Sequence, residues 1–234
     1  MGEADRAGDA AAGNIASSRA EPRWPMAISV LLAILLQVGT PHRGRVPGWW
    51  AFPIVELVLL VVVILRDPGR IDRRSRAARR STIVLIGVMT FGTMAGVGVL
   101  IYDILSGVSD VNATDLLGRG AALWFTNIIV FSLWYWEFDR GGPAERAAGS
   151  GTQASFAFPE DAMPELAPPG WTPKYPDYLY LAFTNATAFS PTDTLPVMTW
   201  AKMTMLLQSV VSLVTAILVI ARAINVLPDN VVPR

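Results

Sequence analysis

Long apolar runs alternate with short polar segments along most of the chain, a pattern typical of a polytopic membrane protein. A helix needs about 20 apolar residues to cross a hydrocarbon core about 30 Å thick. The second run would form a helix about 26 Å long, which is just enough. We predict five membrane-spanning helices, at residues 25–38, 49–65, 81–105, 116–138 and 199–227.

The first of these runs also matches a secretory signal peptide, because Arg19 and Arg23 precede a short apolar stretch. However, the run ends in "QVGTPHRGRVPG", which offers no good small-residue cleavage site, and further spans follow. A retained first span is therefore the favoured interpretation.

A shorter apolar stretch, "YLYLAFTNATAFSPTDTLP", precedes the last run. Pro176 and Asp177 predict a helix start, since proline suits the first turn and an acid favours the positive end of the helix dipole. From there to Phe189 a helix is only about 20 Å long, too short to cross. Pro191 lacks an amide hydrogen and disfavours helix at Ser190. We therefore predict a re-entrant half-helix that breaks at this point.

The predicted fold class is all-α, an integral membrane helix bundle with five transmembrane helices and a re-entrant half-helix before the last span. Several prolines between the fourth span and the half-helix forbid a long helix there. The predicted domains are a disordered cytoplasmic tail (1–23), a four-span bundle (24–138), an irregular Pro/Gly-rich cytoplasmic linker along the surface (139–176), and the half-helix with the final span (177–228).

The orientation follows from "RDPGRIDRRSRAARR" between the second and third spans, which holds seven arginines. Short loops rich in Lys and Arg stay in the cytoplasm. Counting spans from this loop predicts a cytoplasmic amino terminus and a periplasmic carboxyl terminus. The same loop also suits a patch for lipid headgroups, which is cytoplasmic as well. The Arg-rich, Ala-rich composition indicates a bacterial protein, and hence a bacterial inner membrane.

Composition narrows the possible chemistry. The chain is 52% hydrophobic and only 16% charged, with a mean hydropathy of +0.41. Nineteen acids balance nineteen bases, so no nucleic-acid partner is expected. There is no cysteine, and the single histidine, His42, lies in a short loop, so neither a metal site nor a cofactor is expected. With no catalytic motif either, we do not expect an enzyme.

Two groups of uncharged polar residues are candidates for a pore or ion site. The first surrounds the predicted break, where hydroxyls and an amide can satisfy backbone groups that lipid cannot. The second is a stripe on the last span that ends at Thr215. A stripe of this kind either lines a pore or joins helices inside the bundle, and both alternatives stay open. The candidates are Thr184, Asn185, Thr187, Ser190, Thr192, Asp193, Gln208 and Ser212.

Four ionisable residues lie within or near the spans: Glu56, Asp103, Arg119 and Arg222. An unpaired charge at this depth is costly. If the half-helix does not cross, all four lie near the same membrane face, so we predict a Glu56–Arg222 pair with the other two as further partners. Glu56 is either a proton or cation site or one half of a structural ion pair.

Gly92 and Gly96 form a GxxxG pattern in the third span. Such a pattern predicts close helix packing, within one chain or between chains.

Two resemblances extend this picture. "NIIVFSLWYWEFDRGGP", "FPEDAMPELAPPGWTPKYPDYLYLAFTNATAFSPTDT" and the closing apolar helix resemble an uncharacterised bacterial polytopic membrane-protein family, a domain of unknown function. The resemblance implies the same span order and Arg-rich loop, and no activity. The family has a histidine in its fourth span, which this chain lacks.

Residues 178–227 are also similar to the pore loop and inner helix of tetrameric cation channels. That similarity implies a half-helix whose negative end faces a cation path. The stretch "TAFSPTDT" has none of the glycines that expose carbonyls in a potassium filter, and the predicted loop opens to the cytoplasm. A potassium-selective filter is therefore not expected.

The leading hypothesis is a channel-like or transporter-like protein with a polar site at the broken helix. Its expected partners are the lipid bilayer, a monovalent cation and further copies of the chain in a homo-oligomer. The alternative is a non-catalytic membrane scaffold or partner subunit. An intramembrane enzyme and a lipid-binding or signalling protein are two further hypotheses.

Overall fold

Six long helices make up most of the protein in the computed structural model, which describes residues 21–40, 48–66, 70–71, 75–106, 113–188 and 193–226. The predicted all-α class is confirmed. The long helices are α2 (Trp24–Gly39), α3 (Ala51–Arg66), α4 (Arg76–Leu105), α5 (Ala113–Phe138), α8 (Tyr175–Ala188) and α9 (Thr199–Val226). The short helical elements are η1 (Asp139–Gly141), α6 (Pro143–Ala147) and α7 (Pro159–Ala162).

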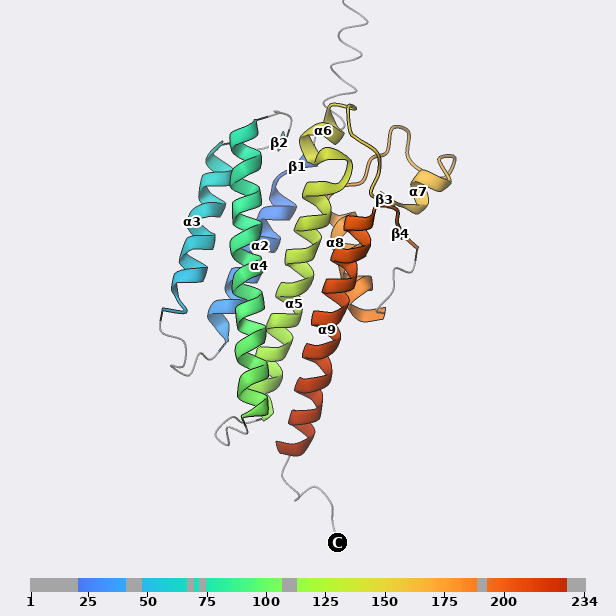
Figure 1. Ribbon diagram of the computed structural model, residues 1–234. Helices are drawn as coiled ribbons and strands as arrows, with labels where there is room; N and C mark the ends of the chain where they lie inside the picture. Colours follow the sequence, from blue (N-terminus) through green and yellow to red (C-terminus); the bar gives the residue numbers. More distant parts are fainter. Residues whose placement is uncertain are drawn as a thin grey trace, which may run out of the picture.

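Two antiparallel pairs of two-residue strands fasten distant segments at one end of the bundle. β1 (Glu21–Pro22) pairs with β2 (Arg70–Ile71), and β3 (Phe156–Ala157) pairs with β4 (Leu195–Pro196). We call this end, which also carries η1, α6 and α7, the cap end (Figure 1).

Three helical segments are long and apolar enough to cross a membrane: Arg76–Leu105, Thr114–Gly141 and Thr199–Arg222. The other two predicted spans correspond to α2 and α3, which have 16 residues each. At 1.5 Å per residue each is about 24 Å long, short of a typical hydrocarbon core. Membrane insertion is thus supported by three helices rather than five.

The start of α4 differs from the prediction. The helix begins at Arg76, five residues before the predicted start at residue 81. The side chain of Ser75 caps it by accepting a hydrogen bond from the Ala78 amide at 3.2 Å. Arginine and alanine are good helix formers, so the polar segment continues the helix beyond the apolar run.

Helix α5 is the centre of the bundle and packs against α2, α4, α8 and α9 (Figure 1). Every residue from Thr126 to Leu133 is buried. A helix that is covered on all sides tolerates apolar residues around its whole circumference, which explains the continuous run "IIVFSL".

Helix α8 covers only part of the bundle length. It starts at the cap end, and the chain returns to that end, because β4 pairs with β3 and the Trp200 ring lies 5.8 Å from the Phe156 ring. Helix α9 then runs past the end of α8 towards the opposite end of the bundle (Figure 1). The described chain therefore begins at the cap end with Glu21 and finishes at the opposite end with α9.

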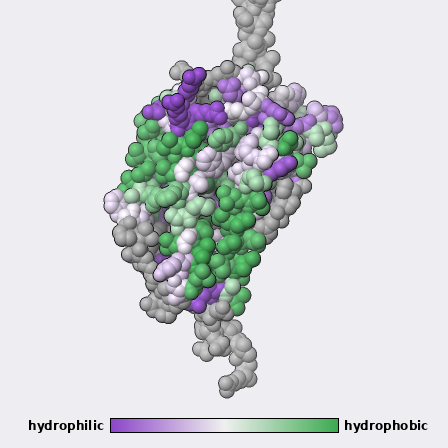
Figure 2. Space-filling view, in the orientation of Figure 1, coloured by the Kyte–Doolittle hydropathy of each residue, from purple (hydrophilic) through white to green (hydrophobic). Residues whose placement is uncertain are grey.

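The sides of the bundle are apolar. Figure 2 shows a broad hydrophobic band between a polar cap end and polar atoms at the opposite end. Large side chains in contact with the surroundings include Leu35, Val58, Phe91, Leu206 and Ile220. This distribution is the reverse of a soluble surface and suits a lipid environment.

Candidate functional site

The amino-terminal end of α8 is held by its own cap. The helix begins at Tyr175, one residue before the predicted start at Pro176. The Asp177 carboxylate accepts a hydrogen bond from the Lys174 amide at 2.7 Å. The last described residue of α8 is Ala188, and the predicted break at Ser190 and Pro191 lies outside the described residues.

The inner face of α8 is joined to α5 and α9 by a polar cluster around Gln208. The Gln208 amide accepts hydrogen bonds from Asn185 Nδ2 at 2.8 Å and from the Tyr135 hydroxyl at 2.6 Å, and it donates to the Ala182 carbonyl at 2.8 Å. Asn185 also donates to the Met205 carbonyl at 3.0 Å. Gln208 and Asn185 are at most 2% exposed, so this cluster is sealed from the surroundings.

The predicted stripe on α9 continues this cluster along α5. Asn127 Nδ2 donates to Ser212 Oγ at 3.0 Å, and Thr215 is 3% exposed one turn further along. Within the described ranges, Asn127 Oδ1 and Thr215 Oγ1 have no hydrogen-bond partner. The stripe therefore faces the interior of the bundle. We call Tyr135, Asn127, Asn185, Gln208 and Ser212 the amide cluster.

Of the remaining predicted candidates, Thr184 and Thr187 lie on α8, and Asp193 lies in the segment before β4. Thr184 is half-buried, whereas Thr187 and Asp193 are exposed. Both threonine hydroxyls donate to carbonyls of their own helix, at 3.0 and 2.9 Å. The exposed Tyr180 hydroxyl donates to Asp193 Oδ2 at 3.3 Å. Ser190 and Thr192 lie outside the described residues. The eight candidates thus do not form one site, because some of those that are described are buried between helices and others are exposed. The buried ones are Asn185, Gln208 and Ser212, and the exposed ones are Thr187 and Asp193.

Of the four predicted ionisable residues, Asp103, Arg119 and Arg222 lie near the end of α4, the start of α5 and the end of α9. Glu56 lies beside the middle of α4 instead, since a Cβ atom at Gly92 would be 3.5 Å from Glu56 Oε1. Arg119 Nη1 lies 3.5 Å from Asp103 Oδ2. The predicted Glu56–Arg222 pair is wrong. Glu56 is fully buried and accepts a hydrogen bond from Gln37 Nε2 of α2 at 2.8 Å. Helices α2 and α3 are consecutive and adjacent, so Gln37 is in reach, while Arg222 lies half-buried in the last turn of α9.

Both glycines of the GxxxG pattern contact neighbouring helices of the same chain. A Cβ atom at Gly92 would lie 3.3 Å from Phe52 of α3, and one at Gly96 would lie 2.8 Å from Leu123 of α5. A third close approach was not predicted: a Cβ atom at Gly120 would lie 2.5 Å from Val219 of α9. The glycines therefore serve packing within the bundle.

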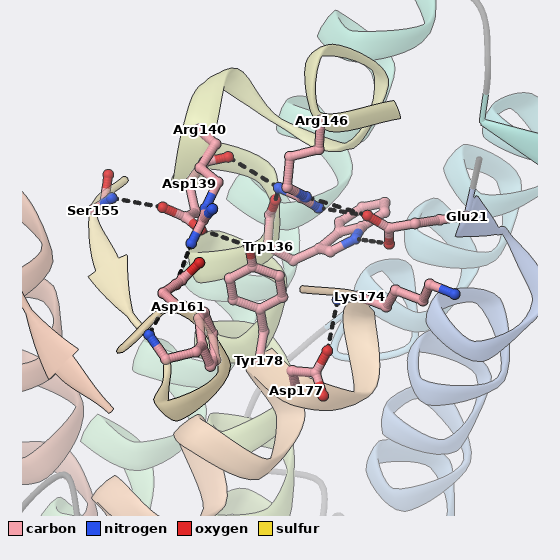
Figure 3. A network of polar contacts seen from close by, with 11 residues as sticks. Glu21, Trp136, Asp139, Arg140, Arg146, Ser155, Asp161, Lys174, Asp177 and Tyr178 are labelled. Carbon is pink, nitrogen blue, oxygen red and sulfur yellow. Dashed lines mark hydrogen bonds and ion pairs between the residues drawn. The ribbon is translucent and has the colours of Figure 1, made fainter. Parts of the chain in front are cut away.

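The sequence reasoning missed a buried network of charged residues in the cap (Figure 3). At its centre, the Glu21 carboxylate accepts from Arg146 Nη2 at 2.9 Å and from Trp136 Nε1 at 2.7 Å. Arg146 also donates to the Trp136 and Asp139 carbonyls. Burial by itself lowers the pKa of Arg146, but Tyr178, Glu21 and Asp139 outweigh it and raise that pKa. The guanidinium therefore stays charged.

A second carboxylate, Asp139, extends the network to α8 and the linker. It accepts from the Tyr178 hydroxyl at 2.6 Å and from the Ser155 amide at 2.7 Å, and Arg140 pairs with it and with Asp161. The predicted surface linker is thus partly a buried cap, since Phe156 and Phe158 are at most 4% exposed. Glu21, predicted to belong to a disordered tail, is 2% exposed and part of β1. The signal in the linker sequence was a pair of aromatics, Phe156 and Phe158, close to several acids.

A cavity of about 430 Å³ opens beside this network. The first turns of α4, the end of α5 and the turn from Gly141 to Glu145 line it. Three of its lining residues are arginines: Arg23, Arg76 and Arg79. The described part of the chain has no group of three or more His, Asp or Glu residues that could hold a metal ion.

Comparison with models of protein families, with curated proteins and with solved structures finds no match to this chain.

Proposed function

We propose that the protein is a channel-like bacterial inner-membrane protein. In this proposal it forms a homo-oligomer, and the outer face of α8 lines a path for a monovalent cation. The observation that carries the proposal is the contrast between the two faces of this half-length helix, whose inner face is sealed and whose outer face presents exposed polar groups.

The inner face supports a path outside the single chain. The amide cluster closes the space between α5, α8 and α9 with hydrogen bonds of 2.6 to 3.0 Å. An ion moving there would have to break several buried hydrogen bonds, each costly to leave unmade. A path on the other side of α8 requires no such rearrangement.

The outer face supports a partner other than lipid. Thr187 is exposed one turn after the exposed Phe183, and Asp193, which accepts a hydrogen bond from the Tyr180 hydroxyl, is exposed as well. A carboxylate that faces hydrocarbon is expensive, and intramembrane acids face protein or water instead. Further copies of the chain around a water-filled axis would supply both.

The direction of α8 suits a cation. Its carboxyl end carries the negative end of the helix dipole and lies part-way along the length of the bundle (Figure 1). Broken helices in transporters and channels hold ions at such ends.

In this proposal all five predicted spans cross the membrane, and local thinning of the bilayer accommodates the short helices α2 and α3. The half-helix re-enters from the cytoplasm, where the amino terminus lies, and the carboxyl terminus is periplasmic.

The test is cation flux into proteoliposomes, with K⁺ and Na⁺ compared. We expect flux for the natural chain and a reduction of about ten-fold or more for Asp193→Asn and for Thr187→Val. Glu165→Gln, an exposed acid in the cap linker, and Thr204→Val, a hydroxyl bonded within α9, are the matched controls and should conduct normally. Absence of flux in all of these proteins, together with a folded monomer in detergent, would overturn the proposal.

The amide cluster itself favours a second candidate function, that of a non-catalytic membrane scaffold or partner subunit. Its hydrogen bonds fasten α8 rigidly to the bundle, as interhelical polar contacts do in many membrane proteins. A folded monomer that conducts nothing, and whose stability falls when Gln208 is replaced, would support this function.

A further inference from the structure

We infer that the arginine-lined cavity at the cap end binds a phosphate-bearing anion, with the headgroup of an anionic phospholipid as its natural source. This site is separate from the outer face of α8, so the proposal of an anion site does not depend on the proposed cation path.

The cavity has the size and position for a headgroup. Its volume of about 430 Å³ lies within the range of small-ligand sites. It adjoins the start of α4 and the end of α5, where the apolar band of Figure 2 gives way to the polar cap. A lipid whose chains lie along the bundle would bring its headgroup to this depth.

The charges of the lining favour an anion. Arg23, Arg76 and Arg79 face Glu137 and Glu145, which leaves one positive charge in excess. Each acid also has a partner within the protein: Glu137 Oε1 lies 3.3 Å from Arg79 Nε, and Glu145 accepts from the Ser150 hydroxyl at 2.9 Å. These contacts reduce the repulsion that an entering anion would meet.

Arg23 makes the site more than a charged surface. It lines the cavity, yet it is only 5% exposed. A phosphate that reaches it is largely removed from water, where a charge-assisted hydrogen bond to a guanidinium is strong. Arg76, by contrast, is exposed at the rim and suits a ligand that arrives from the membrane surface.

Two further features favour phosphate. Helix α4 starts at Arg76, so the positive end of its dipole opens towards the cavity. Residues 66–80 contain seven arginines and only two aspartates, so the whole segment attracts anionic lipid. Basic pockets between membrane helices are known binding sites for anionic headgroups.

The experiment measures lipid binding to the purified full-length protein in detergent by native mass spectrometry. The probes are phosphatidylglycerol, phosphatidylcholine, glycerol 3-phosphate and inorganic phosphate. The variants are Arg76→Gln, Arg76→Lys and, as matched control, Arg80→Gln, an exposed arginine of the same helix outside the lining. Arg79 is left unchanged because its loss would leave the buried Glu137 carboxylate without this partner.

We expect phosphatidylglycerol to bind more tightly than phosphatidylcholine. Arg76→Gln should weaken that binding about five-fold. Arg76→Lys and Arg80→Gln should retain it. Equal binding of the two lipids, or equal losses of phosphatidylglycerol affinity in Arg76→Gln and Arg80→Gln, would contradict the proposed site. Binding of glycerol 3-phosphate or phosphate as tight as that of the lipid would support the phosphate chemistry and assign a soluble source.

Discussion

Arg146 Nη2 lies 2.9 Å from Glu21 Oε1, although 125 residues separate them in the chain. Both side chains are at most 3% exposed, so neither charge is solvated by water. Removing one partner of a buried pair costs about 3–5 kcal/mol, because it leaves the other charge uncompensated. We expect Glu21→Gln to lower the free energy of unfolding by that amount, measured by denaturation in mixed micelles.

The control for this variant is Glu165→Gln, at an exposed acid of the same cap, which should change stability by less than about 0.5 kcal/mol. The double variant Glu21→Leu with Arg146→Leu should recover part of the loss, since it buries no lone charge. Equal stability of Glu21→Gln and the control would contradict a structural role for the pair.

Replacing Gln208 separates a structural role from a conducting one. Gln208→Leu leaves the Asn185 amide, the Tyr135 hydroxyl and the Ala182 carbonyl with fewer partners inside the bundle. We expect a loss of about 1–3 kcal/mol in the free energy of unfolding. Ser209→Ala, at the next position, removes only longer hydrogen bonds of 3.2 and 3.5 Å and should cost less. If Gln208→Leu abolished flux at unchanged stability, the cluster would belong to the ion path instead.

Gly120→Ala tests the contact between α5 and α9. The new methyl group would lie 2.5 Å from Val219 Cγ2 and 3.1 Å from its Cβ, so a stiff β-branched side chain must move. We expect destabilisation by about 1–3 kcal/mol. Gly118→Ala is the matched control, because nothing lies within 4 Å of its added atom. The loss of stability in Gly96→Ala should lie between those of the other two variants, since the atom nearest to the added methyl group is the flexible end of Leu123. A Gly118→Ala protein as unstable as Gly120→Ala would contradict the packing explanation, because helix propensity by itself favours alanine over glycine.

The two ends of the bundle should face opposite sides of the membrane. The chain has no cysteine, so any labelling by a thiol reagent can be assigned to a single introduced cysteine. Leu166→Cys lies in the cap and Ser106→Cys at the end of α4, and both positions are exposed. We expect an impermeant maleimide to label Ser106→Cys in intact cells, and Leu166→Cys only after the membrane is opened. Labelling of both from the same side would contradict the proposed orientation.

The helices were predictable because each depends on a continuous local pattern. The apolar runs at residues 25–38 and 116–138 became α2 and α5 with small shifts at their ends. The start of α4 was missed because Ser75, a single capping residue, decided it. The short apolar stretch before the last run became α8, which begins at Tyr175, one residue before the predicted start.

The contacts between polar residues were much less predictable. Four-residue spacing placed Gln208 and Ser212 on one face of α9. It did not reveal Tyr135, which lies 73 residues earlier in the chain than Gln208. The Glu56–Arg222 prediction failed because the depth of each residue depends on how the helices pack. Glu56 lies beside Gly92 at the middle of α4, whereas Arg222 lies near the end of α9.

The sequence by itself determined the all-α class, the apolar character of the long helices, the half-length of α8 and the strongly positive segment before α4. Each of these properties follows from local composition and periodicity, which act over a few turns of helix. The tertiary structure decided which face of α8 is sealed, that Gly92, Gly96 and Gly120 serve contacts within one chain, and that Glu21 closes the cap. These features depend on burial, close packing and hydrogen bonds between separate segments, from 23 residues apart for Asn185 and Gln208 to 125 for Glu21 and Arg146. Such contacts exist only once the helices have packed.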